Sequence, residues 1–165
     1  MFPRRPLSVP AAAVVFAVLL TGCSSTDAPA SITVPAPPAE EKALCRALHE
    51  ELPESVAGLA RQDPEPRSEL TAGWGDAAIV LRCGVPRPAG MRDPLAPGVV
   101  VNGVEWMAEE RSDDGPRFTT TYRKTYVEVT LSKRFTEVGP LMELAKPVAK
   151  TIPHRFPEAS PTAAG

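Results

Sequence analysis

The chain has 165 residues, with 20 acidic and 18 basic side chains and a formal net charge of −2 at neutral pH. This length allows one compact domain with a hydrophobic core of its own. The slightly acidic balance argues against a nucleic-acid-binding protein, which usually carries a basic face. It also argues against electrostatic adhesion to anionic lipid, so any membrane attachment has to come from another source.

Residues 1–22 have the pattern of a lipoprotein signal peptide. Arg4 and Arg5 precede an apolar run over residues 11–20, which is too short to span a bilayer because that takes roughly 20 residues. The small residues before Cys23 resemble a lipobox, in which the thiol receives a diacylglyceryl group and the chain is cut in front of it. The sequence therefore predicts that acyl chains such as palmitate on Cys23 hold the protein to a membrane. An ordinary secretory signal with an incidental cysteine is the alternative interpretation.

The exported chain divides into three predicted segments. Residues 23–39 hold the acylated cysteine and a stretch rich in Pro, Ser and Ala, which predicts an extended tether of up to about 50 Å at roughly 3.1 Å per residue. Residues 40–153 carry the periodic apolar pattern and form the single predicted globular domain. Residues 154–165 lack such a pattern and are predicted to be disordered.

The domain begins with a predicted amphipathic helix. Leu44, Cys45, Leu48 and Leu52 recur at helical spacing, and acidic and basic residues occupy the other faces. The helix starts near residue 40 and ends before Pro53, which cannot continue it. Cys45 therefore lies on the buried stripe.

A strand is predicted over residues 77–83, where Ile79, Leu81 and Cys83 share one face. An even pair of cysteines in an exported chain favours a disulfide. A Cys45–Cys83 bridge would join the apolar stripe of the helix to the apolar face of the strand. Free thiols remain an alternative, as does a metal site formed by these two cysteines with His49. A metal is disfavoured, because no further Cys or His stands near and the paired Cys-x-x-Cys spacing is absent.

The second half of the chain predicts a hairpin, a reversal, two strands and a final helix. A type I′ turn at Asn102-Gly103 indicates the hairpin, and Pro147 should kink or split the helix. These elements are the hairpin over residues 99–107, the turn at residues 113–116, strands over residues 118–122 and 126–131, and a helix over residues 140–152. The predicted fold is α+β, with one antiparallel sheet of about four to five strands and an N-terminal and a C-terminal helix packed on one face. A small, partly open barrel is the alternative.

Catalytic motifs are not evident in the sequence. The chain has no Gly-x-Ser-x-Gly elbow, phosphate-binding glycine loop or His-Glu-x-x-His helix. His49 and His154 are interpreted as ordinary side chains, and Asp113-Asp114 as part of a turn. The sequence thus predicts no cofactor and no metal, and it favours a non-enzymatic protein. The enzymatic alternative is a hydrolase of wall polymer that uses two carboxylates about 5–10 Å apart; its candidate residues are Asp76, Glu105, Glu109 and Glu128.

Two tryptophans and an arginine are the predicted binding residues. Trp74 lies between Gly73 and Gly75, and glycines beside an aromatic ring can expose its face to a sugar or peptide. Arg82 can pair with a carboxylate of a ligand or partner, and Trp106 follows the predicted hairpin turn. We therefore predict a binding cleft near these three residues. The alternative is that both tryptophans belong to the core and that Arg82 is an ordinary surface residue.

The run WGDAAIVLRCGV at residues 74–85 resembles the signature of an actinobacterial family of small lipoproteins, domain of unknown function 3515. Cys45 with the later Leu52-Pro53, the hairpin at residues 101–106 and YVEV at residues 126–129 resemble it too, so the similarity covers about residues 40–153. The resemblance implies a one-membrane envelope and hence a place at the outer face of the plasma membrane, but no activity. The leading hypothesis is a non-catalytic module that binds a wall component or a membrane protein. A purely structural assembly partner is a further one.

Overall fold

The computed structural model describes residues 31–111, 115–135 and 137–156. The predicted signal peptide, Cys23, Asp113-Asp114 and residues 157–165 lie outside the described residues. The elements, in chain order, are helix α1 (Ala39–Glu51), strands β1 (Ser55–Val56), β2 (Leu59–Ala60), β3 (Thr71–Trp74) and β4 (Ile79–Val85), the 3-10 turn η1 (Ala89–Arg92), strands β5 (Gly98–Val101), β6 (Val104–Glu109), β7 (Arg117–Thr120) and β8 (Tyr126–Leu131), and helix α2 (Gly139–Thr151).

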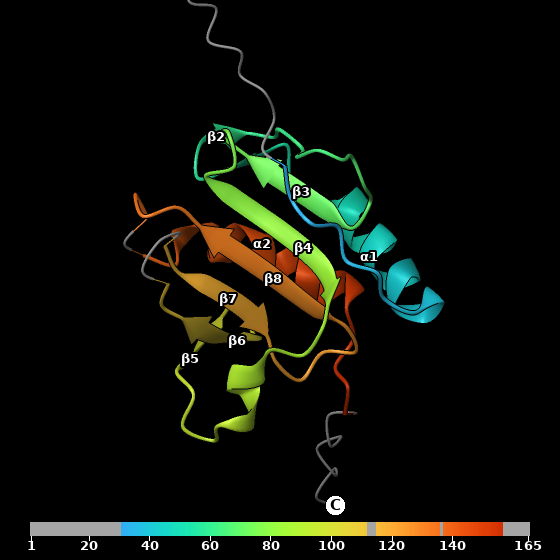
Figure 1. Cartoon of the computed structure of the whole chain (residues 1–165), viewed down its shortest axis with the longest axis vertical. Helices are drawn as coiled ribbons and strands as arrows, with labels where there is room; N and C mark the ends of the chain where they lie inside the picture. Colours follow the sequence, from blue (N-terminus) through green and yellow to red (C-terminus); the bar gives the residue numbers. More distant parts are fainter. Residues whose placement is uncertain (1–30, 112–114, 136, 157–165) are drawn as a thin grey trace, which may run out of the picture.

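The main sheet has six antiparallel strands in the order β3-β4-β8-β7-β6-β5, and β1 and β2 form a separate hairpin (Figure 1). The α+β prediction is confirmed, but the expected four to five strands are too few. The sequence analysis missed β3 and the β1–β2 hairpin. In the described part of the chain β3 and β5 end the sheet on opposite edges, so the sheet is open and the barrel alternative is wrong.

One face of the sheet is apolar and packs against the two helices. The strand register places Ala72 and Trp74 of β3 beside Leu81 and Ile79 of β4, and alternate residues of the other strands continue this face. Helix α2 lies behind the sheet in Figure 1 and contacts β5 and β6, whereas α1 contacts β4. The helices also contact each other, an arrangement that the sequence did not predict. The core thus lies between one sheet face and a layer of two helices.

The predicted disulfide is confirmed, because Cys45 of α1 is bonded to Cys83 of β4. Both cysteines are about 1% exposed and belong to the core. Helix α1 is thereby fixed to the apolar face of β4, as the two periodic patterns indicated.

Helix α2 runs without interruption through Pro147, so the predicted split is wrong. Pro147 is buried on the apolar side of the helix, and it removes the hydrogen bond that residue 147 would donate to Glu143. Glu143 is exposed, so its carbonyl group can bind water in place of the missing donor. The packing of the apolar face outweighs the loss of one hydrogen bond.

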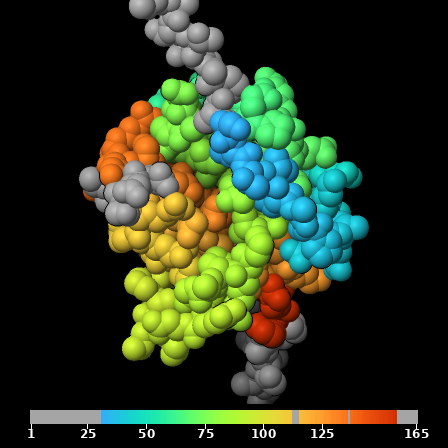
Figure 2. All heavy atoms as spheres, viewed as in Figure 1, coloured from blue at the N-terminus to red at the C-terminus, as the bar shows by residue number. Residues whose placement is uncertain are grey.

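The folded domain extends beyond the predicted range of residues 40–153 at both ends. At the N-terminal side the amide of Ile32 donates to the carbonyl of Glu65 over 3.0 Å, and Pro35 is buried. Figure 2 shows this segment (blue) lying on the surface of the domain against green residues. At the C-terminal side the amide of Arg155 donates to the carbonyl of Tyr122 over 2.6 Å. Part of the predicted tether and the start of the predicted tail therefore belong to the domain.

Candidate functional site

The face of the sheet opposite the helices is polar and carries a row of ion pairs. Nη1 of Arg82 lies 3.0 Å from Oε1 of Glu128, whose side chain is 8% exposed. Arg117 lies between Glu128, at 3.7 Å, and Glu109, at 3.1 Å. These charges pair with one another on the surface of the sheet, so the row is a network of ion pairs that links β4, β8, β7 and β6.

A pocket of about 590 Å³ lies on the same face, beside β5 and β6. This volume is within the roughly 300–1,000 Å³ that is usual for small-molecule sites. Its wall combines apolar and aromatic side chains with a few charged groups, in the pattern typical of binding pockets. The apolar and aromatic lining includes Met91, Met107, Tyr122, Tyr126 and Phe156, and the charged lining consists of Arg87, Asp93, Glu105 and Arg155.

One wall of the pocket is the proline-rich segment of residues 86–98. Short local bonds shape it, because Nη2 of Arg87 donates to the carbonyl of Met91 over 2.8 Å, and the amide of Leu95 donates to Oδ1 of Asp93 over 2.9 Å. A Cβ placed on Gly90 would lie 3.3 Å from Sδ of Met107. The segment therefore packs on β6 and forms one wall of the pocket.

The opposite wall is the C-terminal segment after α2. It is held by Arg123, a charged residue that is only 3% exposed. Nη1 of Arg123 donates to the carbonyl of Ile152 and Nη2 to the carbonyl of Gly103, each over 3.0 Å. The guanidinium of Arg155 lies 5.2 Å from the centre of the Tyr126 ring. In Figure 2 this segment (red) meets the green segment before β5 at the lower end of the polar face. No motif in the sequence marked Arg123 for this role.

The pocket offers both apolar contact and polar recognition. Val100, Tyr122 and Phe156 on its wall are 67%, 60% and 65% exposed, and exposed apolar residues gathered at a cavity are typical of binding surfaces. Arg87 and Arg155 are also exposed. Oε2 of Glu105 is buried and has no hydrogen-bond donor among the described residues. A ligand with an apolar group and an acceptor for an arginine would match this wall.

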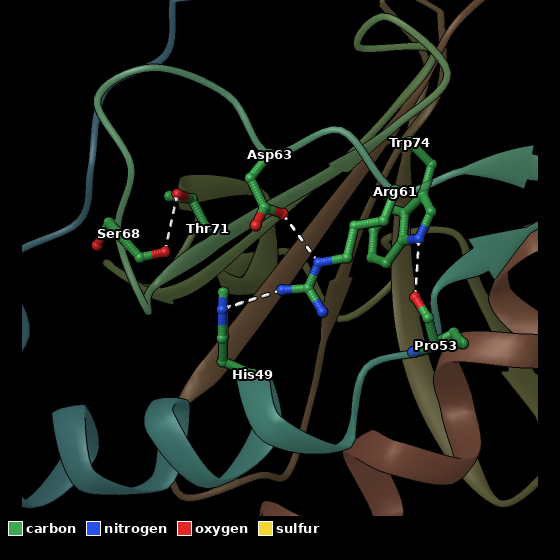
Figure 3. A network of polar contacts seen from close by, with 7 residues as sticks. All are labelled: His49, Pro53, Arg61, Asp63, Ser68, Thr71 and Trp74. Carbon is green, nitrogen blue, oxygen red and sulfur yellow. Dashed lines mark hydrogen bonds and ion pairs between the residues drawn. The ribbon is translucent and has the colours of Figure 1, made fainter.

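The structure does not bring the three predicted binding residues together. Trp74 and Trp106 are 0% and 1% exposed and belong to the apolar face, although Trp106 also borders the pocket. Nε1 of Trp74 donates to the carbonyl of Pro53 over 3.0 Å (Figure 3). Arg82 points to the other face and is paired with Glu128. These three residues therefore form no common cleft.

The glycines beside Trp74 have a packing role. A Cβ on Gly73 would lie 2.7 Å from the carbonyl oxygen of Gln62, and a Cβ on Gly75 would lie 2.7 Å from Cδ1 of Leu59. The two glycines let residues 59–62 approach β3, and they do not expose the indole ring. The Gly-Trp-Gly signal was thus a signal of close backbone packing.

A second polar cluster joins α1 to the loop after β2 (Figure 3). Arg61 contacts Oδ1 of Asp63 through Nε and Nε2 of His49 through Nη2, each at 3.0 Å. Burial, followed by the positive charge of Arg61, lowers the pKa of His49. His49 is therefore suited to be neutral at pH 7 and to accept from Arg61. The cluster lines a polar depression of about 550 Å³.

Two of the candidate carboxylates of a hydrolase, Glu109 and Glu128, flank the same arginine, Arg117. Glu109 and Glu128 are held by arginines, and Asp76 lies in the turn between β3 and β4. Glu105 and Glu109 share one face of β6, but four residues of strand separate them by about 13 Å along the chain, beyond the roughly 5–10 Å of catalytic pairs. Among the described residues no group of three or more His, Cys, Asp or Glu is placed to hold a metal ion.

The structure is a small α+β domain whose antiparallel sheet is covered by helices on one face and has a pocket on the other. The model of the family described as protein of unknown function (DUF3515) matches residues 5–156, and the chain belongs to this family. The family resemblance predicted from residues 74–85 is thus confirmed. No curated protein and no solved structure matches the chain. None of the described helices is both long enough and apolar enough to cross a membrane.

Proposed function

We propose that this protein is an actinobacterial envelope lipoprotein, anchored through Cys23 at the outer face of the plasma membrane, and that it is a non-catalytic binding or accessory module. The observation that carries the binding function is the pocket of about 590 Å³ with its exposed apolar wall. A cell-wall component or a membrane protein is the proposed partner.

The proposed anchoring rests on the sequence before the domain. The basic start, the short apolar run and the small residues before Cys23 are the features of a processed lipoprotein. Two or more acyl chains give stable attachment, whereas a single chain binds only marginally. The Cys45–Cys83 bridge supports an exported location, because disulfides persist in oxidising compartments.

The binding function can be tested by photo-crosslinking in intact cells. A photoreactive amino acid at position 100, on the exposed wall of the pocket, should capture a ligand or partner. The matched control is the same amino acid at position 146, which is exposed on α2. Equal yields and identical products at both positions would contradict a binding role of the pocket.

The anchor is tested by Cys23→Ser. We expect the variant to be released to the medium or to stay in the membrane with its signal peptide attached. Normal cleavage together with normal membrane attachment would contradict the lipoprotein assignment. Because this experiment does not involve the pocket, its result is independent of the crosslinking result.

A wall-polymer hydrolase is the second candidate, favoured by the place of the candidate carboxylate Glu105 on the wall of the pocket. The proposal of a binding module predicts no turnover of muropeptides by the full chain. Turnover by the full chain that is lost in Glu105→Gln would show that the protein is an enzyme and not a non-catalytic binding module. A structural assembly partner would give protein crosslinks from position 100 and no small ligand.

A further inference from the structure

Strand β5 forms an edge of the six-stranded sheet, and its pairing in the described structure is with β6 alone. Its sequence is Gly-Val-Val-Val, without a charged residue or a proline inside the strand. Proteins commonly protect such edges with charges, prolines or covering segments, because an exposed edge can pair with another chain. Strand β5 itself carries no such protecting residue, and only its length of four residues limits the edge that another chain could pair with.

The register identifies the backbone groups that point outward from this edge. Val101 and Val104 flank the two-residue turn at Asn102-Gly103. In such a tight hairpin, the two residues that flank the turn form a hydrogen-bonded pair. Farther along, the amide of Ala108 donates to the carbonyl of Pro97 over 2.8 Å. Bonded pairs alternate with non-bonded pairs, so the N–H and C=O groups of Gly98 and Val100 point away from β6. Both residues are exposed.

The opposite edge of the sheet shows how this protein covers an edge. The amide of Gln62 donates to the carbonyl of Gly73 over 2.8 Å, and the amide of Gly75 donates to the carbonyl of Ala60 over 3.0 Å. Residues 60–62 therefore occupy the edge of β3. No described segment does this at β5.

The exposed edge borders the pocket directly. Gly98 and Val100 both line it, and the side chain of Val100 lies on the polar face, opposite Glu105. A strand added to β5 would lie about 4.8 Å from it, and its alternate side chains would project over this face. A large apolar side chain of such a strand can reach the pocket. Arg87 and Arg155 are exposed residues of the pocket wall, where each donates one N–H group to a backbone carbonyl, and their remaining N–H groups complement an acidic group on the same strand.

We propose that β5 is a docking edge for an extended, acidic peptide segment, which adds a seventh strand to the sheet and places a large apolar side chain in the pocket. This inference rests on the proposed binding function and names its ligand class. Backbone hydrogen bonds to Gly98 and Val100 fix the register of the peptide on β5. The pocket then selects the apolar side chain of the peptide, and Arg87 and Arg155 select its carboxylate.

The experiment uses the full chain in lipid nanodiscs and a pool of linear, N-acetylated heptapeptides, each with alternating β-branched residues, one phenylalanine or leucine and one aspartate. We expect bound peptides to slow amide hydrogen exchange at Gly98 and Val100, but to leave Val99 and Val101, which already pair with β6, nearly unchanged. Val100→Pro removes the outward donor and should lower affinity about tenfold. Val100→Thr keeps the donor and is the matched control.

The peptide itself provides a second pair of controls. N-methylation at alternate residues should abolish binding in one register, and replacing the aspartate by asparagine should weaken binding about threefold at low salt. Equal binding of Val100→Pro and Val100→Thr, or protection of the pocket without protection of Gly98 and Val100, would overturn the strand addition. Either result leaves the proposed pocket function intact.

Other occupants give distinct results. Absence of any peptide binder, together with crosslinking of glycan at position 100, would overturn the peptide as ligand and support a wall-polymer ligand. A dimer that is lost in Val100→Pro and competes with no peptide would show that the edge pairs with a second copy of the chain. No crosslink at position 100 and no binder would remove both the inference and the proposed function.

Discussion

Trp74→Ala tests whether this tryptophan is a core residue or a ligand-binding residue. Its side chain is 0% exposed, and its indole N–H donates to the carbonyl of Pro53 over 3.0 Å. Truncation of a buried tryptophan to alanine costs about 3–5 kcal/mol through lost transfer energy and the remaining cavity. An ordered domain of about 125 residues has an unfolding entropy of about 0.26 kcal/mol/K near its midpoint, at roughly 2.1 cal/mol/K per residue. A loss of about 4 kcal/mol therefore lowers Tm by about 15 °C.

The assay is thermal unfolding followed by circular dichroism, with peptide binding measured well below the new Tm. We expect Trp74→Ala to have a lower Tm than the parent and the same affinity for peptides, because the indole lies on the face of the sheet opposite the pocket. Tyr122→Ala is the matched control, because this side chain is 60% exposed and lines the pocket; it should lose affinity with little change in Tm. A Trp74→Ala variant with an unchanged Tm and a lost affinity would refute the core assignment.

Three further predictions follow from contacts away from the pocket. Replacing Cys45 and Cys83 by alanine opens a bridge between residues 38 apart, which should lower the unfolding free energy by about 4 kcal/mol in the chain-entropy model, as denaturant titration would show. Burial, followed by the charge of Arg61, lowers the pKa of His49 on folding, so the unfolded state binds the proton more tightly. The free energy of unfolding should therefore fall as pH decreases from about 6.5 towards the folded pKa. Denaturant titrations at several pH values should show a smaller pH dependence for His49→Gln. Glu128→Gln should destabilise by about 1–3 kcal/mol and Glu109→Gln by less than about 1 kcal/mol, because the Glu128 side chain is 8% exposed and that of Glu109 is 26% exposed; equal losses in thermal melts would contradict the ranking.

The parts of the fold that were predictable are those with a strong local signal. The helical period around Cys45 and the alternation around Cys83 fixed which face each cysteine occupies, so their bridge followed from two independent patterns. The Asn102-Gly103 turn predicted a hairpin because both residues need a positive φ, and they have φ values of 48° and 76°. Local backbone chemistry decided these elements.

The parts that were missed depend on contacts between distant segments. Strand β3 consists of Thr-Ala-Gly-Trp, in which Ala and Gly disfavour a strand although Thr and Trp favour one. It forms because β4 and residues 60–62 pair with it on either side. The proline-rich stretch before α1 looked like free tether, yet Pro37 packs on Gly84. Composition predicts an extended chain, but it does not tell whether the chain lies on the domain or away from it.

The pocket was missed for the same reason. Its walls come from residues 86–98, from the start of β6 and from the segment after α2, which no sequence period connects. Arg123 fixes one wall through two backbone carbonyls that lie 20 and 29 positions away in sequence. A charged residue in a short loop between strands reads as a surface residue, so its burial could be found only from the structure.

The packing of residues 31–38 also bears on how the proposed anchor would orient the domain. If Cys23 is the anchor, seven residues separate it from Ser31. The eight residue-to-residue steps span at most about 28 Å, roughly half of the tether predicted from composition. Ser31 bridges to Glu65, and the described chain starts at the end of the domain opposite β5 (Figure 1), whose residues Gly98 and Val100 line the pocket. The pocket would then face away from the bilayer, towards the cell wall.

This orientation can be measured with nitroxide labels in nanodiscs that contain a nickel-chelating lipid. A label at position 67, next to the Ser31 bridge, should be relaxed more strongly by the lipid-bound nickel than a label at position 95, beside the pocket. Both side chains are highly exposed, with 81% for Arg67 and 87% for the whole residue at Leu95, so neither label disturbs the core. Stronger relaxation at position 95 would place the pocket against the membrane, and the peptide bound at β5 would then have to come from the membrane surface, such as an extended juxtamembrane segment of a membrane protein.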